Sequence, residues 1–108
     1  MEIVDLKFIP IATIHFTEEE VASLAIAASK HRDSSCRSLI QEGGLIFEMA
    51  RVSGPRGTDK ALYEDEVNKL LRTTRQDQVM TTNWEIKMLH ERLLEIAKQL
   101  ELAFNKAN

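Results

Sequence analysis

The stretch of sequence that decides the fold runs from Thr82 to Lys106 and reads TNWEIKMLHERLLEIAKQLELAFNK. Its apolar residues recur at steps of three and four, which places them on one side of an α-helix. Thr82 and Glu85 have the spacing of a capping box, in which each side chain binds the other residue's backbone N–H. We therefore predict one long amphipathic helix over residues 82–106. Its main apolar face carries Ile86, Leu89, Leu93, Ile96, Leu100 and Ala103.

This helix offers more apolar surface than its main face. The positions that flank the main face hold few opposite charges, so the pattern does not favour a parallel coiled coil. A second, thinner apolar strip carries Met88, Leu94 and Leu102. We expect one face to pack within the chain and the other against a second copy or a target. The alternative is that the rest of the monomer covers both faces.

In the N-terminal part of the sequence, the spacing of apolar residues changes from that of a β-strand to that of an α-helix. Residues 3–16 alternate apolar and polar, as a β-strand does, with an interruption at Pro10. Thr17 and Glu20 then form a second capping-box pattern, followed by apolar residues at helical spacing. We predict an extended segment over residues 1–16 and a helix over residues 17–42, which the glycines at 43 and 44 end.

The remaining segments are shorter. Residues 45–52 are apolar and fit either a helix or a buried strand, with a helix favoured. Glycine and proline predict a loop over 53–58, a helix follows over 59–72, and a polar connector leads to the last helix. The prediction is a single domain of the mainly α class: a bundle of three to four helices with a short N-terminal extended or β segment.

Composition narrows the classes of function. The 108 residues carry a net charge of −3, which gives no general attraction to nucleic acid or to an anionic membrane. No apolar run is long enough to span a bilayer. The single cysteine, Cys36, allows no intrachain disulfide, and the start of the sequence lacks a signal-peptide pattern. We expect a cytoplasmic protein that does not bind nucleic acid directly.

Catalytic and metal-binding patterns are not evident. His31 and Cys36 are five residues apart, about 140° around a helix, so they do not share a face. No histidine or cysteine spacing matches a metal site. We predict no enzyme activity, no metal and no cofactor. The loop at 53–58 (SGPRGT) offers amides and Arg56 for an anion, so the alternatives are a small-ligand or nucleotide-sequestering protein and a nucleic-acid-associated regulator.

The start of the last helix is the predicted partner site. Trp84 is the only tryptophan in the chain, and Met88 follows it by one turn. Tryptophan is enriched at binding hot spots, and methionine adapts to varied surfaces. We predict that a protein partner contacts Trp84, Met88, Leu89, Arg92, Leu93 and Ile96.

Two further stretches carry a resemblance to known proteins. Residues 27–37 read AASKHRDSSCR, and residues 43–49 read GGLIFEM. Over residues 17–72 the chain resembles a group of small phage and prophage proteins, which share a His-aromatic-Asp-x-x-Cys pattern followed by a Gly-Gly-apolar-aromatic turn. The chain departs from this pattern at Arg32, where the group has an aromatic residue. The resemblance implies a mobile-element origin, and such proteins often bind and disable a host protein.

In size and helical content the chain is also similar to the small antiactivators of bacterial quorum sensing, which sequester a transcription regulator. This similarity is one of class and rests on no shared motif. Taken together, the sequence predicts a non-catalytic, homodimeric protein-interaction module. We expect it to bind and inhibit another protein, such as a bacterial transcription regulator or a host defence component.

Overall fold

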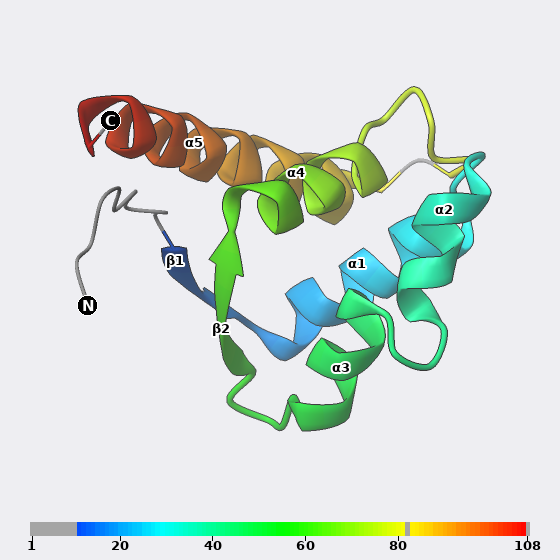
Figure 1. Cartoon of the computed structure of the whole chain (residues 1–108). Helices are drawn as coiled ribbons and strands as arrows, with labels where there is room; N and C mark the ends of the chain where they lie inside the picture. The colour runs from blue at the N-terminus through cyan, green and yellow to red at the C-terminus, as the bar shows by residue number, and fades with distance from the viewer. Residues whose placement is uncertain (1–10, 82, 108) are drawn as a thin grey trace.

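The computed structural model describes residues 11–81 and 83–107 (Figure 1). Within these ranges the chain is mainly helical and includes a two-stranded antiparallel sheet. The mainly α class is thus confirmed, but the fold is not a pure bundle. In chain order the elements are β1 (Ile11–Phe16), α1 (Glu18–Ser29), α2 (Ser34–Arg37), the 3-10 helix η1 (Ser38–Ile40), α3 (Leu45–Val52), β2 (Thr58–Tyr63), α4 (Glu64–Thr73) and α5 (Trp84–Ala107).

The start of α1 follows the predicted capping box. The Thr17 hydroxyl accepts the Glu20 backbone N–H at 3.1 Å, and the Glu20 carboxylate accepts the Thr17 N–H at 2.9 Å. Both backbone donors would otherwise lack a partner at a helix terminus. The extended segment before the cap is confirmed over β1. The part of the strand prediction before residue 11 lies outside the described residues.

The prediction of one helix over residues 17–42 is wrong. Helix α1 ends at Ser29 because the backbone beyond it pairs with the connector between α4 and α5. The Lys30 carbonyl accepts the Met80 N–H at 2.8 Å, and the Arg32 N–H donates to the Gln78 carbonyl at 3.0 Å. These long-range hydrogen bonds replace the helical ones that residues 30–32 would otherwise make.

His31 sits at this break and is fully buried. Its Nδ1 accepts the Asp33 N–H at 2.9 Å, so its Nε2–H donates to the Arg72 carbonyl, also at 2.9 Å. The imidazole thereby joins the start of α2 to the end of α4. The Asp33 side chain caps α2 by accepting the Ser35 N–H. His31 is therefore a structural link, as a buried polar side chain with both ring nitrogens engaged.

The prediction of a helix over residues 59–72 is wrong in its first part. Residues Thr58–Tyr63 form β2, which pairs antiparallel with β1 in a register that runs from Ile11 opposite Tyr63 to Phe16 opposite Thr58. The predicted start of the helix at residue 59 therefore lies inside the strand. Helix α4 begins only at Glu64, and the Glu66 carboxylate accepts the Tyr63 N–H at its start.

Gly57 connects the predicted loop to β2. Its φ is +79°, and a Cβ at this position would lie 2.0 Å from the Phe16 carbonyl oxygen. Only glycine fits both the left-handed backbone and the close approach of β1. The segment over residues 45–52, which the sequence left open between helix and strand, is the helix α3.

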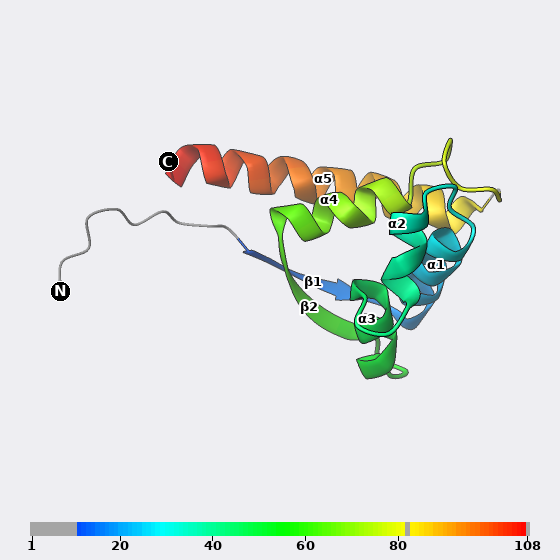
Figure 2. The same cartoon turned by 45° about the vertical axis from the view of Figure 1, so that its right-hand side comes forward.

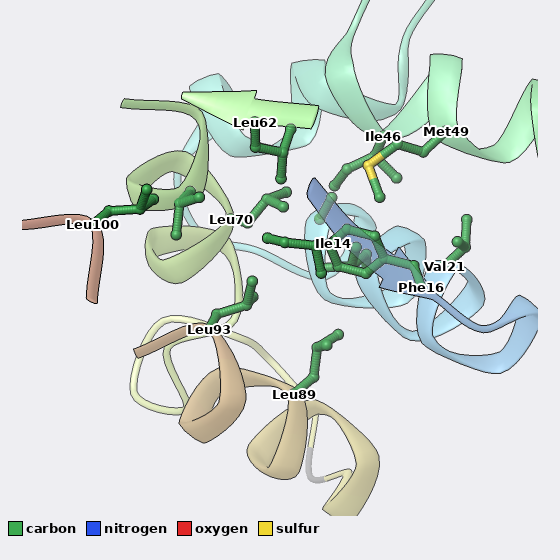
Figure 3. Close-up of a cluster of buried hydrophobic side chains, with 13 residues drawn as sticks. Ile14, Phe16, Val21, Ile46, Met49, Leu62, Leu70, Leu89, Leu93 and Leu100 are labelled. Atoms are coloured by element: carbon green, nitrogen blue, oxygen red, sulfur yellow. The ribbon is translucent and has the colours of Figure 1, made fainter. Parts of the chain in front are cut away.

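One main hydrophobic core joins β1, α1, α3, β2, α4 and α5 (Figure 3). Leu89 and Leu93 point from α5 toward Ile14 of β1 and Leu70 of α4, and α4 lies alongside α5 in both views (Figures 1 and 2). A smaller cluster of Ala27, Val79 and Ile86 fixes the connector against α1 and the first turn of α5. The buried cores are built from Ile14, Phe16, Val21, Leu24, Ala27, Ala28, Ile46, Met49, Leu62, Val67, Leu70, Val79, Ile86, Leu89, Leu93 and Leu100.

The long C-terminal helix is confirmed with small differences at its ends. It spans Trp84–Ala107, and its main apolar face packs within the chain from Ile86 to Leu100, whereas Ala103 is exposed. The predicted cap at Thr82 lies outside the described residues. Asn83 takes this part instead, because its side-chain oxygen accepts the Glu85 N–H at 2.8 Å.

Candidate functional site

Helix α5 presents a second face that the monomer leaves open. Its main face is buried, whereas the side chains of the opposite strip are exposed. Trp84 is 68% exposed, Met88 47%, Leu94 41% and Leu102 69%. Large apolar side chains gathered along one strip of a surface helix mark an interaction site more often than isolated ones do.

The Trp84 end of this strip borders a hollow between α1 and α5, which we call the α1–α5 groove. The groove has a volume of about 410 Å³. Helix α5 supplies its apolar side, through Trp84, Met88 and the edge of Leu89. The side chains that line it are Glu19, Glu20 and Ser23 from α1, and Trp84, Glu85, Met88, Leu89 and Arg92 from α5.

Polar contacts between α1 and α5 hold the groove walls in place. The Ser23 hydroxyl donates to the Glu85 carboxylate at 3.1 Å. At the other end of the groove the Arg92 guanidinium pairs with the Glu20 carboxylate and donates to the His15 carbonyl at 2.8 Å. Arg92 therefore links α5 to α1 and β1 at once, and the groove has a fixed width before any partner arrives.

The ion pair also acts on the protonation of Glu20. Partial burial raises the pKa of Glu20, but the hydrogen bond from the Thr17 backbone, with the hydrogen bond and charge of Arg92, more than offsets this. The net result is a pKa below the ordinary value of 4.5. Glu20 is therefore an ionised carboxylate at neutral pH.

The six predicted partner-binding residues do not form one surface. Trp84 and Met88 are exposed beside the groove, and Arg92 lies at its end with its guanidinium already paired. Leu89 lines the groove from below but is buried. Leu93 belongs to the core, and Ile96 is partly buried against it. The exposed residues of the predicted site are therefore Trp84, Met88 and Arg92.

The residues of α1 in the groove were not predicted. The sequence places three acidic residues, Glu18, Glu19 and Glu20, at the start of a helix. Acidic residues in this position complement the helix dipole and are expected to face water. Nothing in the sequence places α1 beside α5. The one local signal was the capping box, which fixes where Glu20 points but not what it meets.

Other candidate chemistry finds little support in the geometry. Over residues 11–81 and 83–107 no three His, Cys, Asp or Glu side chains gather closely enough to hold a metal ion. Cys36 is buried as a free thiol. The His15 Nδ1 lies 2.6 Å from the Asp59 Oδ1. Both side chains are on the exposed face of the sheet, outside the groove.

The loop over residues 53–58 is less suited to an anion than its sequence indicates. Gly54 and Gly57 turn their backbone groups toward each other, with the Gly57 N–H donating to the Gly54 carbonyl at 2.8 Å. These amides are thus used by the turn itself. Arg56 is exposed on the loop.

The search for relatives adds no constraint on function. The chain matches no known family model, no curated protein and no solved structure. In the described part of the chain, no helix is long and apolar enough to cross a membrane.

Proposed function

We propose that this chain is a non-catalytic protein-interaction module that binds another protein at the α1–α5 groove and inhibits it. The observation that carries the proposal is the exposure of Trp84 and Met88 beside a preformed apolar hollow. Tryptophan is among the residues that contribute most to binding when a partner buries it. Its exposure leaves apolar area for a partner to remove from water, at roughly 25 cal/mol per Å².

The mode of binding that fits these features is a helix laid into a groove. An apolar side chain of the partner would enter between Met88 and the α1 wall, above Leu89. Trp84 would cover it from the open end. Methionine has flexible torsions and a polarisable sulfur, so Met88 can adapt to the shape of the entering side chain.

Inhibition would follow from occupancy. If the bound segment is one that the target uses for its own assembly, the complex blocks that assembly. A host defence component is the target class that the phage-type resemblance implies, and a bacterial transcription regulator is the target class that the similarity to small antiactivators implies. We place the activity in the cytoplasm, in keeping with the free thiol of Cys36.

The contribution of Trp84 to partner binding can be tested by removing its indole ring. Trp84→Ala should abolish capture of the target from the native host, read by mass spectrometry, while the unfolding midpoint stays unchanged. Leu102→Ser is the matched control, because Leu102 is equally exposed on the same helix but lies outside the groove. Equal capture by the parent protein and Trp84→Ala would refute the proposal.

The homodimer remains a separate proposal. The exposed strip continues from the groove to Leu94 and Leu102, which a second copy would bury. Light scattering at high micromolar concentration should give twice the chain mass for the parent protein and the single mass for Leu102→Asp. A strict monomer in both cases would contradict it.

A further inference from the structure

The α1–α5 groove has an acidic rim. Glu19 and Glu20 line it from α1, and Glu85 and Arg92 line it from α5. The Lys87 ammonium adds a second positive charge beside the groove, because it lies over the Trp84 ring at 5.7 Å from the ring centre. Counted as formal charges, three carboxylates, one guanidinium and one ammonium leave an excess of one negative charge. An apolar hollow with such a rim favours an occupant that carries positive charge beside its apolar anchor.

The three carboxylates differ in how fully the chain satisfies them. Glu20 is paired with Arg92, and Glu85 accepts one hydrogen bond from Ser23. For Glu19, no hydrogen bond or ion pair is found among the residues that the structure describes. Glu19 on α1 and Glu85 on α5 therefore line the groove from different helices, each with capacity for further hydrogen bonds.

The charges of the chain argue against a second copy as the occupant. The chain has a net charge of −3. The exposed charged residues of α5 between Met88 and Leu102 are Glu91, Arg92, Glu95, Lys98 and Glu101, which leave an excess of one negative charge. Pairing this strip with another copy's groove would bring carboxylates toward the acidic rim, which is unfavourable.

We infer that the groove receives a basic amphipathic helix of a different protein. A groove between two packed helices has the shape that receives the ridge of a third. The apolar ridge of the incoming helix lies over Met88 and Leu89, and its lysines or arginines reach Glu19 on one side and Glu85 on the other. This inference rests on the proposed function, and it adds the chemical class of the partner.

The experiment uses three synthetic helical peptides and the fluorescence of Trp84, the only tryptophan in the chain. All three peptides have the same length. The first carries leucines at helical spacing flanked by lysines, the second replaces the lysines by glutamates, and the third replaces the leucines by serines. The lysine–leucine peptide should move the Trp84 emission to shorter wavelength and bind more weakly as salt rises, and the other two should leave the emission unchanged.

Charge reversal at the rim provides the decisive comparison. The double variant Glu19→Lys with Glu85→Lys should weaken binding of the lysine–leucine peptide by about a hundredfold, at about tenfold for each reversed contact. The same variant should bind the glutamate–leucine peptide. Glu91→Lys with Glu95→Lys is the control, because it changes the net charge of the chain equally, at residues of α5 outside the groove. Equal effects of the two double variants would overturn the inference, since only general attraction would then remain.

The results separate this inference from the proposed function. If Trp84→Ala loses the host target but rim reversal leaves peptide preference unchanged, the groove binds a protein and the basic-helix inference is wrong. If Trp84→Ala keeps the host target and no peptide shifts the emission, both fail. An emission shift that depends only on the concentration of the chain itself would show a second copy in the groove, which also overturns the inference.

Discussion

The two faces of α5 use the same kinds of residue for different purposes. On the inner face Leu89, Leu93 and Leu100 are buried in the main core, where α5 packs against α4, α1 and β1. On the outer face Met88, Leu94 and Leu102 are exposed, although they too are apolar and lie only one or two residues away along the chain. The comparison teaches that apolar periodicity locates the buried face of a helix, whereas the apolar residues outside that period stay exposed in the monomer.

The largest effect expected from this comparison concerns neighbouring leucines. Leu93 is 1% exposed, so Leu93→Ala leaves a cavity and should lower the free energy of unfolding by about 2–5 kcal/mol. Leu94→Ala, one position along, should change it by less than about 0.5 kcal/mol. Urea unfolding checks both, and similar losses would mean that the two faces are not distinct in the monomer.

The next effect concerns the junction that stops α1. His31→Ala removes the hydrogen bonds to the Asp33 N–H and the Arg72 carbonyl, leaves these part-buried groups without their partner, and empties the buried space of the imidazole. The free energy of unfolding should fall by roughly 2–3 kcal/mol. His15→Ala removes an exposed imidazole and serves as control, with a loss below about 1 kcal/mol. A loss no larger at His31 than at His15 would show that the junction does not depend on the ring.

The smallest effect concerns the ion pair at the end of the groove. The pKa of Glu20 lies below 4.5 in the folded chain, so the carboxylate stabilises the fold above pH 4.5, and this contribution is lost as the pH falls through the lowered pKa. Because the pair is partly exposed, the contribution should be less than about 1 kcal/mol. The difference in stability between the parent protein and Glu20→Gln should shrink as the pH falls, and a difference independent of pH would contradict the pairing.

Local signals in the sequence predicted the elements that depend on local contacts. The capping box of Thr17 and Glu20 was confirmed, because its two hydrogen bonds join residues within one helical turn. The helix α5 was also confirmed, because each step of its apolar period spans about one turn. The long helix over residues 17–42 and the helical start at residue 59 were wrong. In each case the backbone pairs with a distant segment: residues 78–80 for His31 and its neighbours, and β1 for β2.

The groove illustrates the same limit for the candidate site. Trp84 and Met88 were predicted from composition and helical spacing alone, and their exposure agrees with a surface role. Leu93 and Ile96 were placed in the same predicted site, but they face the core. The acidic wall from α1 was missed, because it becomes part of the site only through the packing of two helices more than 60 residues apart in the sequence.

Two consecutive residues offer the most direct test of the separation between the faces of α5. Met88 and Leu89 both border the groove, but Met88 is exposed and Leu89 is buried. In urea unfolding followed by Trp84 emission, Met88→Ser should stay within about 0.5 kcal/mol of the parent protein, whereas Leu89→Ser should lose more than about 2 kcal/mol. Equal losses for the two variants would mean that Met88 supports the fold and is not free for a partner.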